Sequence, residues 1–263
     1  MCTPHQYCIL LKNVSGKARS LVRKMNMGIE TIVDLPLKGE WVAPHTPADR
    51  VPSHGTDALG QRYAFDMYRT DVIKKRKFHN ESWLKYFTVG ISIDKCFCYK
   101  ERIYSPVDGR VAVVKDGVKE PQRLQPLLDL FKVILRSVSI FLLARIIPKE
   151  KIDLQRYIGN YVIIEFDGKY AFFAHISPGS ICIKEGQYVR RGDMIGLVGH
   201  SGSSTAPHLH FHCMDSQNLL KAKGIPIVFK KYEVFHNSQW IVIENSIPTG
   251  VQRFRSTDEH QVN

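Results

Sequence analysis

Three histidines, His208, His210 and His212, alternate with other residues in one short apolar segment. If that segment is a β-strand, the three imidazoles lie on the same face. Zinc prefers imidazole nitrogen among its ligands, and catalytic zinc sites leave one coordination position open for water. The segment therefore predicts part of a catalytic zinc site.

The remaining members of such a site must come from elsewhere in the chain, and a carboxylate is a usual ligand in hydrolytic sites. Asp66 lies in an apolar run and follows a loop that contains a histidine, and His175 ends another apolar run. Bound zinc activates water and polarises a carbonyl, while histidines can transfer the protons. The chain contains no His-Glu-x-x-His motif. The acid and base work therefore cannot be assigned to a glutamate of that kind.

Short apolar runs separated by turn residues surround these candidates. They predict strands at 63–68, 105–114, 187–189 and 194–199, and a hairpin whose strands, 161–166 and 169–175, flank Asp167-Gly168. The prediction is a mainly β fold, an antiparallel sandwich or barrel. We also expect short strands within 6–37 and, because it is rich in proline and polar residues, a loop at 39–53.

One segment departs from this pattern. Residues 124–147 have apolar side chains near helical spacing, interrupted by Asp129 and several basic residues. This predicts an inserted amphipathic helix. Its apolar side either packs on the β-domain or forms a lid or an element that lies on a membrane surface.

Four ordered motifs resemble the lysostaphin/LytM-type zinc endopeptidases. The segment 199–211, with Gly199-His200-Ser201-Gly202 and Pro207-His208-Leu209-His210, resembles the family signature. Residues 170–177 resemble its Tyr-x-His-Leu element, residues 104–111 its Pro-x-Asp-Gly turn, and residues 186–198 its Gly-Asp hairpin. The resemblance covers about 50–115 and 158–213 and implies an antiparallel, barrel-like β fold (the duplicated hybrid motif).

The resemblance also implies roles for individual residues. By position, His210 and Asp66 match zinc ligands, and His175 and His208 match the histidines that assist catalysis. It implies one Zn²⁺ ion and a peptide substrate in the cross-links of bacterial peptidoglycan. Members of the family are usually extracellular or part of the cell envelope.

The first zinc histidine of the family is missing at its usual place, four residues before Asp66, where this chain has Arg62. Arginine does not ligate zinc. We expect the loop at 55–61 to fold back and bring His54 beside Asp66 as the third ligand, with His45 as the weaker substitute. The alternative is a catalytically inactive member of the same fold that only binds or regulates. His212 replaces an acidic residue common in the family and is expected to support a ligand or lie on the surface.

These motifs suggest three regions. Residues 1–38 are expected to form an N-terminal β extension, 39–228 the peptidase domain with a helical insertion at about 120–155, and 229–263 a C-terminal β extension and tail.

Lys and Arg number 37 against 25 Asp and Glu, a net charge of +12. This suits an anionic cell-wall polymer or membrane surface, and no basic and aromatic pattern typical of a nucleic-acid site is present.

The six cysteines form no Cys-x-x-Cys pair and are expected to be reduced. The N-terminal residues do not resemble a signal peptide, so a wall enzyme would need another export route or a missing leader. A third hypothesis for the function, which rests only on the similarity of one turn to turns in carrier domains, is a lipoyl carrier or a histidine phosphocarrier that uses His175 or His210.

Overall fold

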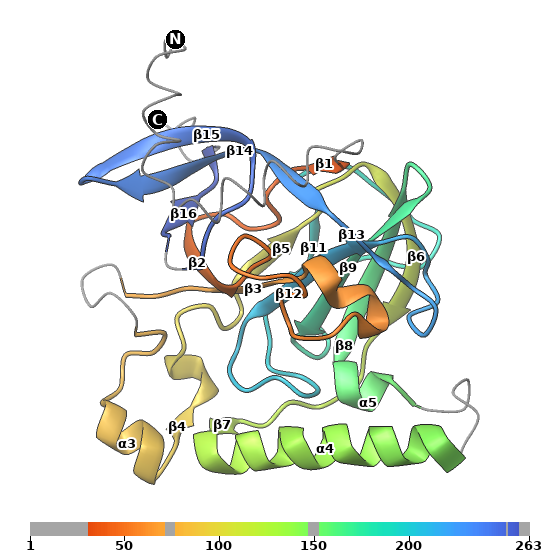
Figure 1. Ribbon diagram of the computed structural model, residues 1–263. Coiled ribbons are helices and arrows are strands. Elements are labelled where there is room, and N and C mark those ends of the chain that lie inside the picture. Colours follow the sequence, from red (N-terminus) through yellow and green to blue (C-terminus); the bar gives the residue numbers. More distant parts are fainter. Residues whose placement is uncertain (1–30, 72–76, 147–152, 251, 258–263) are drawn as a thin grey trace.

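The computed structural model describes residues 31–71, 77–146, 153–250 and 252–257 (Figure 1). The strands expected between residues 6 and 30, and therefore most of the extension 1–38, lie outside the described residues. From that region the structure describes β1 (Thr31–Val33).

Within the described residues, twelve strands form one mixed and mostly antiparallel sheet, which confirms the predicted mainly β fold. Its one parallel pair within that part of the chain is β1 with β14. The strands along the sheet are β1, β14 (Ile227–His236), β16 (Phe254–Arg255), β2 (Glu40–His45), β3 (Phe65–Tyr68), β12 (Leu209–Met214), β9 (Lys169–Ile176), β8 (Asn160–Phe166), β6 (Gly109–Lys115) and β10 (Tyr188–Val189). Two further strands, β13 (Gly224–Ile225) and β15 (Gln239–Ser246), pair with β12 and β14.

Two short ribbons and several helices complete the described fold. The ribbons join β5 (Arg102–Tyr104) to β11 (Met194–Leu197) and β4 (Ile91–Ser92) to β7 (Arg123–Leu124). The helical elements are the 3₁₀ turns η1 (Ala58–Tyr63) and η2 (Ile93–Lys95) and the helices α3 (Trp83–Thr88), α4 (Pro126–Ile146) and α5 (Gln155–Ile158). No helix in the described part of the chain is long and apolar enough to cross a membrane.

The central strands of the sheet are buried on both faces. All residues of β12 are buried, and so are all of β8 except Glu165. The β8–β9 hairpin forms at Asp167 and Gly168, as the sequence predicts. Both turn residues have positive φ, 47° and 69°, which a tight two-residue turn requires.

The loop expected at 39–53 is wrong over residues 40–45, which form β2. Trp41 and Ala43 alternate into the core, at 1% and 0% exposed, and this burial outweighs the proline at the end of the strand. β2 pairs with β3 on one side and β16 on the other. The C-terminal strands therefore continue the same sheet as the central strands.

The helix expected at 124–147 is present as α4. The interpretation that its apolar side packs on the β-domain is wrong, because Leu127 and Phe131 are 70% and 63% exposed. The cysteines within the described residues (Cys96, Cys98, Cys182 and Cys213) are free thiols, as expected.

A candidate metal centre around Asp66

Asp66 lies on β3 between two strands that each carry a histidine. The sheet register places His45 of β2 opposite Asp66 on one side and His210 of β12 opposite it on the other. Residues that are opposite one another on neighbouring strands have side chains within contact distance. Strand pairing alone therefore gathers three possible zinc ligands.

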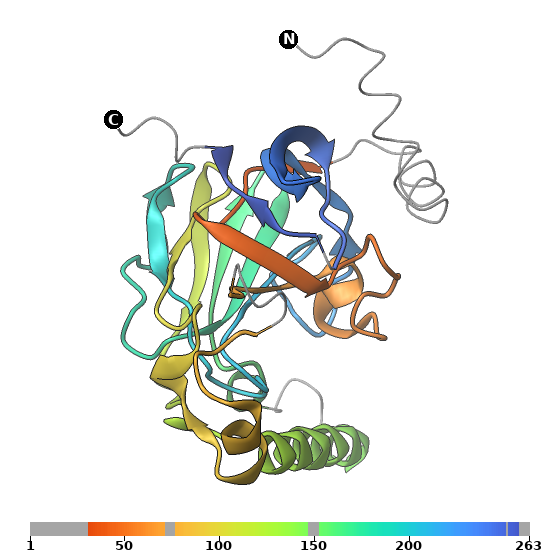
Figure 2. The same cartoon turned by 90° about the vertical axis from the view of Figure 1, so that its left-hand side faces the viewer.

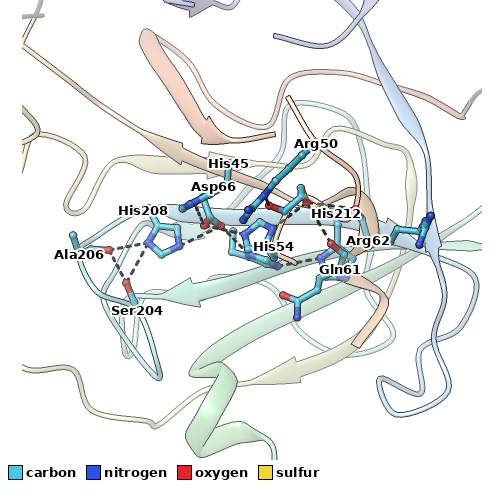
Figure 3. Close-up of polar contacts among 12 residues, drawn as sticks. His45, Arg50, His54, Gln61, Arg62, Asp66, Ser204, Ala206, His208 and His212 are labelled. Carbon is cyan, nitrogen blue, oxygen red and sulfur yellow. Dashed lines mark hydrogen bonds and ion pairs between the residues drawn. The ribbon is translucent and has the colours of Figure 1, made fainter. Parts of the chain in front are cut away.

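The side chains converge on the two oxygens of this carboxylate (Figure 3). On Oδ2, His45 Nδ1 lies at 3.0 Å and His54 Nε2 at 2.9 Å. On Oδ1, His210 Nδ1 lies at 2.8 Å and His208 Nε2 at 3.4 Å. Four imidazoles therefore surround one buried carboxylate that is 7% exposed.

His54 reaches the cluster because the chain between β2 and β3 folds back on itself. The backbone N–H of Ser53 donates to the carbonyl of Arg62 at 3.0 Å, which closes the loop between them. Ser53 Oγ lies 3.0 Å from His54 Nδ1, so the other ring nitrogen of His54 faces Asp66. Gly60 in η1 has a φ of +73°, and an added Cβ there would meet the Met214 side chain at 3.0 Å. The close packing of η1 on β12 thus needs glycine at this point.

Arg62, which occupies the family's usual histidine position, points away from the cluster (Figure 3). Its guanidinium makes two hydrogen bonds to Asp57, at 2.7 and 2.9 Å, and its side chain is 41% exposed. Since Arg62 points away from Asp66, the loop can place His54 beside the carboxylate instead.

The donor set fits a zinc ion. Ligand atoms about 2.0–2.2 Å from a tetrahedral ion lie about 3.3–3.6 Å apart, and the separations around Asp66 need to change by only a few tenths of an ångström. One ligand atom from each of His45, His54 and Asp66 also lies within 4.8 Å of the others. His54 Nε2 is buried and has no hydrogen-bond partner among the described residues, although it lies 2.9 Å from Oδ2. An unsatisfied, buried lone pair beside a carboxylate is what an ion would satisfy.

His208 and His175 each hold one ring nitrogen against a backbone carbonyl. His208 Nδ1 donates to Ala206 O at 2.7 Å, and His175 Nδ1 donates to Ser201 O at 2.9 Å. Because a carbonyl only accepts, both protons lie on Nδ1 and both Nε2 atoms carry a lone pair when the rings are neutral. The two rings are neighbours, with centroids 4.8 Å apart.

The backbone also fixes these two histidines. His175 has a φ of 62°, a conformation that a non-glycine residue adopts rarely and that often marks a functional position. His208 stacks on Tyr68, with ring centroids 4.9 Å apart and planes 15° from parallel.

His212 lies behind His210 and supports it. Its Nδ1 lies 3.2 Å from His210 Nε2, and the residue is 1% exposed, so the alternative that it lies on the surface is wrong. This contact occupies the ring nitrogen of His210 that does not face Asp66. Histidine ligands commonly have such a partner, which fixes the orientation of the ring.

Electrostatics favour an ionised carboxylate at Asp66 and neutral rings at His210 and His175. Burial alone would raise the pKa of Asp66, but the charge and hydrogen bond of His208 and the hydrogen bonds of His210 and His45 outweigh it and hold the pKa well below its ordinary value. Burial lowers the pKa of His210, and it lowers the pKa of His175 still further. Neutral imidazoles are the form that can ligate a metal or accept a proton.

A buried polar network, which the sequence did not reveal, holds the loop that carries His208. Ser204 Oγ donates to Ala206 O at 2.6 Å and lies 3.1 Å from His200 Nδ1 and 3.2 Å from His208 Nδ1. Glu120 accepts from the His200 backbone N–H at 2.7 Å. It also accepts from the hydroxyls of Tyr99 and Ser177, at 2.6 and 3.2 Å. Nothing near Glu120 in the sequence marks it as a partner of a loop 80 residues away.

His200 provides a pH test of this network. Burial lowers the pKa of His200 to about 4, while the charge of Asp129 partly opposes the shift. The unfolded chain binds a proton at this residue below about pH 6.5, whereas the folded protein does not, so acidification favours unfolding. The contribution of neutral His200 to the free energy of unfolding is full above about pH 6.5 and is lost progressively as the pH falls to about 4. The shift corresponds to about 3 kcal/mol.

We expect His200→Gln to remove most of this pH dependence. Free energies of unfolding from urea titrations of metal-free wild type and variant, compared between about pH 7 and pH 4, measure the difference. The other titratable groups are the same in both proteins, so their contributions cancel when the two pH profiles are subtracted. Parallel pH profiles for the two proteins would show that His200 is not held neutral in the fold.

Comparisons with known proteins agree on one family. Residues 144–222 match the sequence model of Peptidase family M23. This segment contains His175, His208 and His210 but neither His54 nor Asp66. The family match therefore bears on only part of the cluster.

Two curated relatives match over short segments. Peptidoglycan DD-endopeptidase ShyA of Vibrio cholerae is 46% identical over 56 residues, which are 21% of this chain and 13% of that protein. Lysostaphin of Staphylococcus simulans is 45% identical over 58 residues, 21% of this chain and 11% of that protein. The matched segments are thus a small part of each relative.

A solved structure of a zinc-containing peptidase from Vibrio cholerae is also similar. It is 23% identical, and the match covers 56% of this chain and 35% of that one with a TM-score of 0.28.

Proposed function

Because the chain belongs to peptidase family M23, the lysostaphin/LytM type, we propose that it is a zinc-dependent endopeptidase that cleaves peptide cross-links of peptidoglycan. The observation that carries the proposal is the convergence of His54, His210 and His208 on the Asp66 carboxylate, at 2.9, 2.8 and 3.4 Å. A structural role for so many buried imidazoles would leave His54 Nε2 unsatisfied.

In this proposal His54, Asp66 and His210 hold the ion. When bound, zinc polarises the scissile carbonyl and makes water a better nucleophile at neutral pH. The three residues differ in what keeps them in place. Asp66 and His210 are fixed by strand pairing, whereas His54 is fixed by the Ser53–Arg62 backbone contact.

His208 and His175 are the proposed catalytic residues. Their Nε2 lone pairs can accept a proton from the attacking water and return it to the leaving amine, since each Nδ1 is committed to a carbonyl. Once protonated, either ring can also donate a hydrogen bond to a developing oxyanion. Burial lowers the pKa of His175 and thereby keeps its ring in the neutral form, with the Nε2 lone pair free.

The substrate is inferred from the relatives, of which the chain spans only about an eighth. ShyA is named for peptidoglycan endopeptidase activity. The net charge of +12 suits a wall that carries anionic polymers. His210 is 8% exposed and its ring is engaged on both nitrogens, which does not suit a phosphocarrier that must present a histidine to a partner.

The experiment that tests the proposal combines metal analysis with cleavage of purified peptidoglycan. We expect one zinc per chain and new amino groups released from peptidoglycan. A chelator should stop the release, and added zinc should restore it. Protein that holds zinc and binds peptidoglycan without releasing amino groups would instead be an inactive binding member of the fold. Protein that takes up no zinc would end the metal-centre proposal itself.

A further inference from the structure

Helix α4 has its apolar side turned to solvent. Asp129 in its first turn is 4% exposed and accepts hydrogen bonds from the Gln125 backbone N–H at 2.7 Å and from Lys132 at 3.2 Å. Seven apolar side chains of the same helix are about half exposed or more: Leu127, Leu128, Leu130, Phe131, Ile134, Leu135 and Val138. A helix that packs on a soluble domain shows the reverse pattern, with its apolar stripe covered.

The spacing of these seven residues puts them on one side of the helix. At about 100° per residue they span roughly 160° of arc, and the buried Asp129 lies outside it. Isolated exposed apolar residues are common on protein surfaces, but a continuous patch of this kind marks an interaction site. The exposed side of α4 therefore needs a partner.

Helix α3 lies beside α4 and also exposes apolar side chains. Both views place α3 beside α4 at the same end of the molecule (Figures 1 and 2). Its exposed apolar side chains are Trp83, Leu84 and Phe87, with Val89 directly after it, at 43% to 76% exposed. We call the eleven side chains on α3 and α4 the apolar surface.

Basic residues flank this surface in the sequence. Lys74, Lys75, Arg76 and Lys77 precede α3, and Arg145, Lys149 and Lys151 lie at and after the end of α4, with one acidic residue, Glu150, among them. Most of these residues lie outside the described part of the chain. Lys85 and Lys132 on the helices themselves are paired with Glu81 and Asp129, so the unbalanced positive charge comes from the flanks.

The positive flanks favour one of two possible partners of the apolar surface, an anionic bilayer, over a second copy of this chain. Two copies of this chain joined through the apolar surface would bring their basic flanks together, which is unfavourable. A bilayer that contains anionic lipid covers the apolar side chains and neutralises the flanks at the same time. Tryptophan is typical of membrane interfaces, and tryptophan, phenylalanine and leucine, which α3 exposes, are typical of the apolar face of a helix that lies in one.

We propose that α3 and α4 dock this protein on an anionic lipid surface, with α4 lying in the plane of the interface. Helix α3 is joined to the candidate metal centre, because its Tyr86 belongs to the same buried cluster as Leu124, just before α4, and Ala206, whose carbonyl accepts from His208. Docking therefore holds the loop of His208 at a fixed position relative to the bilayer. This proposal is independent of peptidase activity.

Vesicle flotation of the full chain tests it. We expect the protein to float with vesicles of mixed phosphatidylcholine and phosphatidylglycerol, and about tenfold more weakly with phosphatidylcholine alone. Raising the salt to about 1 M, where the Debye length is about 3 Å, should remove much of that preference. Trp83 fluorescence should shift to the blue on binding, and Trp83→Phe should lose most of the shift.

The decisive variant is Leu127→Gln/Phe131→Gln/Ile134→Gln, with Tyr188→Gln as its control. Tyr188 is an apolar-bodied side chain on β10, 60% exposed, outside the apolar surface. We expect the triple variant to lose vesicle binding about tenfold or more and to keep the wild-type Tm, since the changed side chains are exposed. The control should bind like wild type.

Several outcomes would overturn the proposal. Wild type that fails to float with anionic vesicles, or a triple variant that still does, removes the lipid surface as the occupant. A wild-type dimer in analytical ultracentrifugation that the triple variant converts to a monomer would show that a second copy covers the surface instead.

Discussion

His54→Ala should lower zinc affinity by about 100-fold or more and reduce cleavage to background. Zinc sites contribute about 10–16 kcal/mol through four ligands, so one ligand accounts for about 3 kcal/mol, or about 100-fold in affinity. His54 Nε2 lies 2.9 Å from Asp66 Oδ2 and has no hydrogen-bond partner among the described residues, so the hydrogen bond that alanine removes is the one between Nδ1 and Ser53 Oγ. Zinc titration with a competing chelator and release of amino groups from peptidoglycan measure the two effects.

Arg62→Ala is the matched control for His54→Ala. Both residues lie on the same loop, but Arg62 is bonded to exposed Asp57 and points away from Asp66. We expect zinc binding and activity within about twofold of wild type, because an exposed pair of this kind contributes little. Loss of zinc in Arg62→Ala but not in His54→Ala would show that the loop does not deliver His54 to the ion.

His45 offers a second comparison within the cluster. Its Nδ1 is 3.0 Å from Asp66 Oδ2, and the hydrogen bond to Asp66 raises the pKa of His45, yet its side chain is 47% exposed against 16% for His54. If His54 and His210 complete the site with Asp66, His45→Ala should keep one zinc per chain. A loss of zinc comparable to that of His54→Ala would make His45 a ligand.

Local patterns in the sequence predicted much of the fold. Turn residues such as Asp167-Gly168 and apolar runs such as 161–166 determine strands and hairpins through neighbours in the chain, so they are visible without the structure. The segment 208–212 also behaves as predicted for its spacing, since His210 and His212 lie close enough for contact. In these places local preference and tertiary packing agree.

The sequence was less informative where the outcome depends on distant partners. Strand β2 was missed because Pro44 suggested a loop, whereas burial of Trp41 and pairing with β3 and β16 determine the strand. The proximity of His45 to Asp66 follows from that pairing and was therefore underestimated. Helical spacing correctly predicted α4, but periodicity cannot show which medium an apolar side will face.

His208→Ala separates binding of the ion from catalysis. We expect the variant to retain zinc, because His54, Asp66 and His210 remain, and to lose about 10²–10⁴-fold in kcat, the usual contribution of a positioned acid or base. Since Ala206 O and Ser204 Oγ hold His208 Nδ1, its Nε2 is already oriented and KM should change little. His236→Ala, on β14, is the control and should leave kcat unchanged.

The corresponding change at His175 shows whether the two rings act together. Their centroids are 4.8 Å apart, and each presents an Nε2 lone pair, so they can share one proton-transfer task. If they do, the kcat of the double variant His175→Ala/His208→Ala will be only slightly below that of the more impaired single variant, because the second change removes a partner that no longer functions. If the two losses multiply, the histidines make separate contributions. Loss of zinc in His208→Ala would move His208 from the catalytic pair to the ligands, since its Nε2 lies 3.4 Å from Asp66 Oδ1.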